Sequence, residues 1–162
     1  MTYFEELYAH YSRDVYRFAL YLCANHAEAE DIASEAFVRA WNATGRIRAA
    51  TAKSYLFAIA RNCYLERLRR GTKQTQLDET TPDSTANPYA DAARRIELNR
   101  VLGALQQLPE VDRTVLLLRV QEGWSYQEIA DAMGLSLPAV KVRIHRVRLK
   151  LAQWRITQET RK

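Results

Sequence analysis

The stretch WSYQEIADAMGLSLPAVKVRIHRVRLKL, residues 124–151, predicts two helices joined by a sharp turn. Ser125 and Glu128 match the S-x-x-E capping box, in which a hydroxyl and a carboxylate satisfy the exposed backbone N–H groups at a helix start. Gly134 can adopt the left-handed conformation that ends a helix, and Ser136 is a suitable N-cap for the next helix. This arrangement is typical of a helix-turn-helix.

The second of these helices is expected to have one apolar face and one cationic face. Its apolar residues recur at helical spacing and predict a buried stripe made of Val140, Ile144, Val147 and Leu151. The residues expected to point away from that stripe, or to flank it, are Pro138, Lys141, Val142, His145, Arg146, Arg148 and Leu149. Arg and Lys on such a face can contact base edges and phosphates in a major groove. A helical hairpin with a solvated basic face is the alternative, but the capping box, the turn glycine and the charge density together favour DNA binding.

Charge is distributed unevenly along the 162 residues, whose net charge is +5. Residues 44–75 and 136–162 each contain eight basic and one acidic side chain. The first 43 residues contain three basic and seven acidic side chains, and residues 76–93 contain four acidic and no basic ones. Two basic segments separated by an acidic one indicate two contacts with one polyanion. On charge alone, two solvated helix faces explain the pattern equally well.

The hydrophobic pattern predicts an all-α protein with two small helical domains joined by a flexible linker. Helical spacing of apolar residues continues over most of residues 1–72, whereas residues 73–92 are rich in Thr, Ser, Asp and Asn and offer little to a core. Further helices follow in residues 93–156, and we assign no role to the polar tail, 157–162. No alternation typical of β-strands is found.

Several classes of protein are not expected from the composition. No apolar run approaches the ~20 residues of a membrane span, and no secretory signal precedes the first helix. Two cysteines do not form a disulfide framework, so a reduced cytoplasmic location is expected without membrane insertion. Cys23 and His26 are the single ligand-like pair, and no metal site, cofactor or catalytic centre is predicted, so we do not expect an enzyme.

The chain closely resembles the extracytoplasmic-function (ECF) sigma factors of the sigma-70 family. Residues 29–41 (AEDIASEAFVRAW) and 55–62 (YLFAIARN) resemble sigma region 2. The motifs LPExxR at 108–113, SYQEIA at 125–130 and VKxRxHR at 140–146 resemble sigma region 4. The motifs cover nearly the whole chain in the expected order, with Tyr55 where the family commonly has Trp and Glu66 where it commonly has Asp.

The resemblance implies that the helix over residues 28–41 docks on the clamp helices of the largest subunit of RNA polymerase core. The matching residues are Glu28, Glu30, Asp31, Glu35, Phe37, Arg39 and Trp41. An acidic edge beside aromatic side chains suits a protein interface and has the wrong sign for DNA. Asp31 and Glu35 lie off the apolar stripe and are the strongest candidates, whereas Phe37 and Trp41 could instead be core residues.

The resemblance also implies two contacts with promoter DNA. The basic loop and helix after residue 44 match the part that reads the minus-10 element and holds its melted strand, with candidate residues Arg46, Arg48, Lys53, Ser54, Tyr55, Phe57, Arg61, Asn62, Arg69 and Arg70. Tyr55 and Phe57 could stack on bases or pack inside. The helix-turn-helix matches the reader of the minus-35 element, with candidate residues Pro138, Lys141, Val142, Arg143, His145, Arg146 and Arg148.

The expected function is therefore that of an alternative sigma factor, which carries RNA polymerase core to specific promoters and helps to open them. Expected partners are the clamp helices and the flap of the core enzyme, promoter DNA, and an anti-sigma factor as a regulator. The rival interpretation is a helix-turn-helix regulator that acts without binding the core enzyme. Such a regulator would need to dimerise to read paired half-sites.

Overall fold

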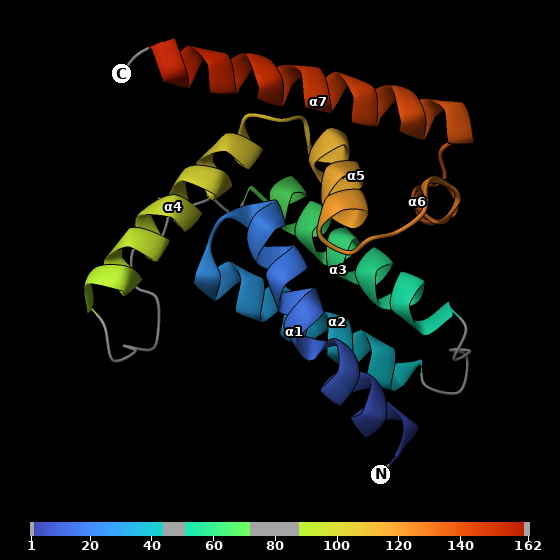
Figure 1. The fold of residues 1–162 in the computed structure, drawn as a ribbon. Coiled ribbons are helices and arrows are strands. Elements are labelled where there is room, and N and C mark those ends of the chain that lie inside the picture. Colours follow the sequence, from blue (N-terminus) through green and yellow to red (C-terminus); the bar gives the residue numbers. More distant parts are fainter. Residues whose placement is uncertain (1, 44–50, 72–87, 161–162) are drawn as a thin grey trace. The chain divides into compact units, whose positions relative to one another are not determined.

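A computed structural model describes residues 2–43, 51–71 and 88–160, and every regular element within them is a helix. This confirms the predicted all-α fold class. None of the described helices has the length and apolar character that crossing a membrane demands. The helices are α1 (Tyr3–Cys23), α2 (His26–Asn42), α3 (Ala52–Arg69), α4 (Pro88–Gln106), α5 (Glu110–Val120), α6 (Tyr126–Met133) and α7 (Leu137–Thr160) (Figure 1).

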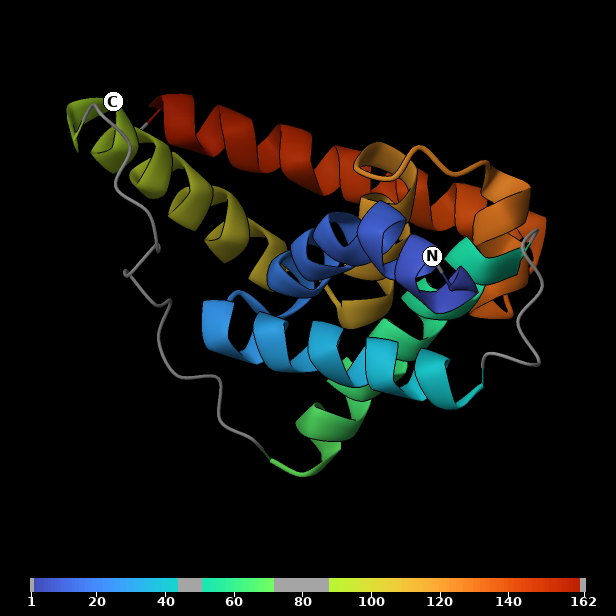
Figure 2. The same cartoon turned by 90° about the horizontal axis from the view of Figure 1, so that it is seen from below.

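The helices form two compact units, residues 1–107 and 108–162. In the first unit, α1 and α2 form an antiparallel hairpin that packs on α3 (Figure 2). Ala24 ends α1 in the left-handed conformation at φ 59°, and the side chain of Asn25 accepts a hydrogen bond of 2.8 Å from the backbone N–H of Glu28 to begin α2. The hairpin brings Phe4 and Trp41 together, with ring centroids 4.8 Å apart.

The core of this bundle is built from one apolar stripe on each helix. Phe18 of α1 packs on Phe57 of α3 with ring centroids 4.9 Å apart, and both side chains are buried. Val15, Ile32 and Leu56 are fully enclosed beside them, with 0% exposure. The side chains outside these stripes include exposed residues such as Tyr8 of α1 and Trp41 of α2.

Helix α4 begins at Pro88, five residues before the predicted start of the second domain at residue 93. Pro is tolerated in the first turn of a helix because its missing N–H needs no partner there, and the alanines that follow favour helix. In the structure α4 belongs to the first unit and packs on α1, whereas the sequence placed it with the helix-turn-helix. Gln106 Nε2 donates a hydrogen bond of 2.9 Å to the carbonyl of Leu22 at the end of α1.

The second unit is formed by α5, α6 and α7. The predicted capping box is present: Ser125 Oγ accepts from the backbone N–H of Glu128 at 3.0 Å, and the Glu128 carboxylate accepts from the backbone N–H of Ser125 at 3.0 Å. Gly134 ends α6 with φ 65°, a conformation that costs other L-residues about 1 kcal/mol or more. Trp124 lies buried just before the capping box and contributes to this core.

Both cysteines are structural core residues. Cys23 and Cys63 are free and buried, and Cys23 Sγ lies 3.4 Å from the Asn25 carbonyl, to which it donates. Burial raises the pKa of the Cys23 thiol to about 12 and that of the Cys63 thiol to about 11. Since the thiolate is the reactive form, neither side chain is prepared for nucleophilic or redox chemistry at neutral pH.

Truncating Phe18 should destabilise the first unit strongly. We expect Phe18→Ala to lower the free energy of unfolding by about 3–5 kcal/mol, because the change leaves a cavity against Phe57. Tyr89→Ala, at a side chain that is 88% exposed, should change it by less than about 0.5 kcal/mol. Urea denaturation of the full chain, followed by circular dichroism, measures both. Equal effects would contradict the proposed core.

The thiols should react slowly while the protein is folded. At pH 8 we expect Ellman's reagent to modify both cysteines at least ~100-fold more slowly than a model thiol, because their raised pKa values leave little thiolate. Both should react at the ordinary rate in 6–8 M urea, roughly the range that unfolds small domains. A rapid first equivalent in the native protein would show that one thiol is accessible and ionised.

Candidate functional site

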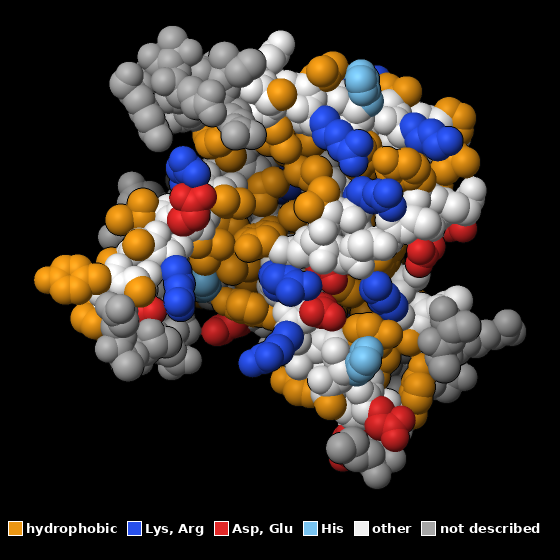
Figure 3. Space-filling view, in the orientation of Figure 1, with side chains coloured by type: hydrophobic (Ala, Val, Ile, Leu, Met, Phe, Trp, Pro, Cys, Tyr) orange, Lys and Arg blue, Asp and Glu red, His pale blue; other side chains and the backbone are white. Residues whose placement is uncertain are grey.

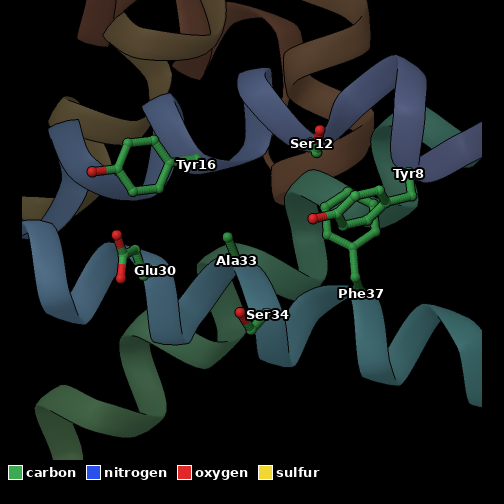
Figure 4. A pocket seen from close by; sticks show the side chains of 7 residues that line it. All are labelled: Tyr8, Ser12, Tyr16, Glu30, Ala33, Ser34 and Phe37. Carbon is green, nitrogen blue, oxygen red and sulfur yellow. The ribbon is translucent and has the colours of Figure 1, made fainter. Parts of the chain in front are cut away.

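A shallow groove of about 250 Å³ lies between α1 and α2 of the first unit (Figure 4). It is lined by Tyr8, Ser12, Tyr16, Glu30, Ala33, Ser34 and Phe37. Tyr16 and Glu30 lie at one end of the groove, and Tyr8 and Phe37 lie at the other. The lining thus offers hydroxyl groups and one carboxylate between aromatic walls.

The polar end of the groove is a network of defined contacts. Tyr16 Oη and His26 Nδ1 are 2.8 Å apart and share a hydrogen bond. Burial raises the pKa of the Tyr16 hydroxyl, and the negative charge of Glu30 raises it further, so the hydroxyl stays protonated. Glu30 itself is exposed. This end therefore presents a carboxylate beside a neutral hydroxyl, a combination that suits a cationic side chain of a protein partner.

The apolar end of the groove continues onto an aromatic cluster. Tyr8 and Phe37 are in contact at 4.9 Å between ring centroids, and Phe4 joins Phe37 to Trp41. Trp41 is 55% exposed and Tyr8 is 51% exposed, whereas Phe37 is only 4% exposed. Trp41 is thus an accessible residue of α2, while Phe37 serves chiefly as a wall and a core residue.

The acidic edge of α2 is partly neutralised by the chain itself. Arg39 Nη2 lies 2.8 Å from Glu35 Oε1 and 2.7 Å from Glu66 Oε2, so it bridges α2 and α3. The hydrogen bond from Arg39 holds the pKa of Glu66 below its usual range. Asp31 lies 3.7 Å from Arg67 in a looser pair. Among the predicted docking residues, Glu30 and Trp41 are therefore more accessible to a partner than Glu35 and Arg39.

Glu28 is half-buried, unlike the exposed Glu30 and Asp31 of the same helix. Its backbone N–H is held by the Asn25 cap. Burial raises the pKa of its carboxyl, while the positive charge of Arg67 opposes that shift. The structure thus places Glu28 at the start of α2 in a partly covered position.

The predicted minus-10 face on α3 is partly exposed, and one assignment needs correction. Phe57 is 2% exposed and packs on Phe18, so it cannot stack on a base without leaving the core. Tyr55, two residues earlier, is 38% exposed and retains the stacking role as a prediction. Asn62, Arg69 and Arg70 are exposed, Lys53, Ser54 and Arg61 are half-buried, and Arg46 and Arg48 lie outside the described residues.

Helix α7 has the two faces predicted for a DNA-reading helix. Val140 and Val147 are 0% exposed and Ile144 is 2% exposed, which confirms the stripe, although Leu151 is only half-buried. Lys and Arg side chains mixed with hydrophobic ones lie along the surface of α7 (Figure 3). The exposed residues of the predicted set are Pro138, Lys141, Val142, His145, Arg146 and Arg148.

Arg143 departs from the rest of the predicted DNA-binding set. Its Nη1 lies 2.8 Å from Asp112 Oδ1 of α5, and the Asp112 side chain is only 7% exposed. The Arg143 side chain is 33% exposed. The guanidinium is therefore engaged within the second unit, and its role in DNA binding stays a prediction.

The sequence interpretation missed the α1 wall of the groove. Tyr8, Ser12 and Tyr16 follow at intervals of four residues, so their hydroxyl groups share one face of α1. This spacing was visible in the sequence, but Tyr8 also fits the helical spacing of the apolar residues in this segment and was therefore interpreted as a core residue. Asp112 was also missed, and no local pattern marks it because its partner lies 31 residues further along.

Two family models match the chain. The model described as Sigma-70 region 2 matches residues 7–74, and the model described as Sigma-70, region 4 matches residues 98–151. The second match begins inside α4, which the structure packs on α1. Neither match includes the last residues of α7.

Curated relatives and solved structures resemble the chain over most of its length. It is 32% identical to the ECF RNA polymerase sigma factor SigE of Mycolicibacterium smegmatis, covering 95% of this chain but 62% of that protein. It is 30% identical to the ECF RNA polymerase sigma factor SigM of Bacillus subtilis, covering 91% of each. The fold matches the sigma factor RpoE solved in complex with the anti-sigma factor NepR from Bartonella quintana, with a TM-score of 0.76, 21% identity and coverage of 93% and 94%. It also matches CnrH solved in complex with the cytosolic domain of CnrY, with a TM-score of 0.73, 25% identity and coverage of 95% and 88%.

Proposed function

Because the chain belongs to the ECF RNA polymerase sigma factors of the sigma-70 family, we propose that it brings RNA polymerase to a specific class of promoters through separate protein-binding and DNA-binding surfaces. The groove between α1 and α2, with Trp41 beside it, docks on the core enzyme. The exposed face of α7 reads the upstream promoter element. The exposed face of α3 holds the opened strand further downstream.

The separation of charge between these surfaces carries the proposal. The groove contains Glu30 and no Lys or Arg among its lining residues, so it repels a phosphate backbone and suits a protein with cationic and apolar side chains. The face of α7 presents Lys141, Arg146 and Arg148 to solvent, so it attracts DNA. A regulator that never bound polymerase would have no use for the groove.

In this proposal the promoter strands open because α3 binds the separated strand, and the chain itself catalyses no reaction. Taking a base out of the duplex costs roughly a few kcal/mol in lost stacking and pairing, which contacts to the opened strand can offset. On α3, Tyr55 offers an aromatic ring and Asn62 offers amide groups for base edges, while Arg69 and Arg70 can neutralise phosphates. We therefore expect no nucleotide hydrolysis and no cofactor, and we place the protein in the cytoplasm with its polymerase.

We also propose that an anti-sigma protein regulates this chain. Two proteins of similar fold, RpoE and CnrH, were solved in complex with NepR and CnrY. Such a regulator would act most directly by covering the groove or α7.

Run-off transcription tests the function directly. Purified core polymerase should initiate from a subset of genomic fragments when this chain is added, and the fragments should share one promoter motif. Core enzyme alone provides the control. If the chain binds DNA but gives no promoter-directed initiation, the rival regulator is the better interpretation.

Reversing the charge in the groove should weaken polymerase binding. We expect Glu30→Arg to weaken the affinity for core enzyme by about tenfold or more, because it places a cation where the partner is expected to bring one. Glu97→Arg, at an exposed acid of α4, serves as the matched control and should bind normally. Affinity is measured by fluorescence anisotropy of the labelled full chain. Normal binding by Glu30→Arg would remove the groove from the docking surface.

Truncating one exposed arginine of α7 should relax sequence preference at one position of the upstream element. We expect Arg146→Ala to cost about 1–3 kcal/mol against the preferred base and less against the others. Arg94→Ala on α4 is the control for loss of a positive charge elsewhere. Holoenzyme binding to promoters randomised at each upstream position gives the measurement. An equal loss for every base would mean that Arg146 contacts phosphate.

A further inference from the structure

The ion pair between Asp112 and Arg143 joins the first helix of the second unit to the predicted reading helix. Asp112 lies in the first turn of α5, and Arg143 is the seventh residue of α7, beside the buried stripe. Nη1 of Arg143 and Oδ1 of Asp112 are 2.8 Å apart, as expected for a charge-assisted hydrogen bond. The Asp112 side chain is 7% exposed, so water cannot easily replace the guanidinium.

The buried stripe of α7 contributes contacts of a different kind from this ion pair. The stripe on α7 consists of Val140, Ile144 and Val147, which are aliphatic side chains whose hydrophobic contacts are non-directional. A binding residue has to be held within roughly 0.5 Å and 10–20° to make a specific contact. A directional bond to a buried carboxylate supplies the restraint that aliphatic packing lacks.

Arg146 provides the internal comparison. It follows Arg143 by three residues on the same side of α7, but it is exposed and makes no salt bridge with a described residue. The two arginines therefore differ in what their guanidinium groups contact. Arg146 is available to DNA, whereas Arg143 is held by Asp112.

We propose that Arg143 and Asp112 form a positioning pair that sets the rotation of α7 and thereby the sequence preference of the reading face. Neither residue is needed to contact a base. Asp112 is a determinant of promoter specificity even though it lies on another helix and is almost fully buried. This inference rests on the proposed role of α7 in reading the upstream element.

A double-mutant cycle in the full chain, assembled with core enzyme, tests the pair. The variants are Asp112→Asn, Arg143→Gln, and the two combined. The readout is the ratio of holoenzyme affinities for a promoter with its selected upstream element and for the same promoter with that element scrambled. Each single change should reduce this ratio by ~10-fold, and the double variant should lose no more than the worse single variant.

Salt dependence separates positioning from direct contact. A residue that neutralises a phosphate lowers the slope of log affinity against log salt by about 1 when it is removed. We expect the slope to be unchanged for Asp112→Asn and for Arg143→Gln. A lower salt slope in Arg143→Gln alone would mean that Arg143 contacts a phosphate. An unchanged affinity ratio in Asp112→Asn would mean that Arg143 acts independently of Asp112, as a base contact. Either result overturns the inference.

Folding is checked by thermal melting followed by circular dichroism, and Arg143→Lys keeps the test valid if a neutral variant unfolds. Lys retains the charge but not the planar fork, so its ratio should lie between wild type and Arg143→Gln. If Arg143→Lys and Asp112→Asn both keep the wild-type affinity ratio, the proposal that the two residues act as a positioning pair is overturned. If the wild-type holoenzyme fails to distinguish the scrambled promoter, the proposed function of α7 fails and this inference fails with it. If the wild-type holoenzyme distinguishes the selected promoter from the scrambled one and the Asp112 and Arg143 variants do so equally well, this inference fails and the proposed function of α7 stands.

Discussion

The burial of Val140, Ile144 and Val147 attaches α7 to α5 and α6, and it also decides which side chains of α7 remain outside. A helix that buries positions spaced by three and four residues has to expose those about half a turn away. The cationic face of α7 is thus a geometric consequence of its apolar stripe. In the first unit, the same constraint encloses Phe18 and leaves Tyr8 exposed on the groove side of α1.

Charged side chains that lie beside a buried stripe form ion pairs within the chain, whereas those further round the helix are exposed to solvent. Arg39 and Arg143 are both half-buried, and each pairs with a carboxylate from another helix. Glu30 and Arg146 are exposed and remain accessible to partners. Since a partly covered charge gains most from a fixed partner of opposite sign, the boundary of the core is where a chain pairs its own charges. Exposed charges are then the better candidates for recognition.

Periodicity was sufficient to predict the helices and most of their buried residues, but it was not sufficient to sort the aromatic side chains. Phe57 and Tyr55 are two residues apart, and only packing against Phe18 shows that the first is core and the second accessible. Phe37 and Trp41 differ in the same way, because both lie near the edge of the α2 stripe and Trp41 lies close to the end of the helix.

Contacts between helices could not be predicted from local sequence patterns, because such patterns do not specify how far apart two helices lie. Arg39 and Glu66 are 27 residues apart, and nothing in either segment specifies the distance between α2 and α3. The i, i+4 pair of Arg39 with Glu35 was readable from the sequence, but its consequence for the docking surface depended on Glu66 as well. The early start of α4 had a local signal in Pro88 and its following alanines, which was outweighed by the polar composition around it.

The two proposed contacts differ in how they should respond to salt. Docking through the groove would cover the exposed aromatic side chains of Tyr8 and Trp41, and such an apolar contribution would be weakly screened by salt. Binding through α7 releases counterions from DNA for each phosphate that Lys141 or Arg148 neutralises. If both proposed surfaces are correct, raising the salt concentration should weaken promoter binding before it separates the chain from polymerase.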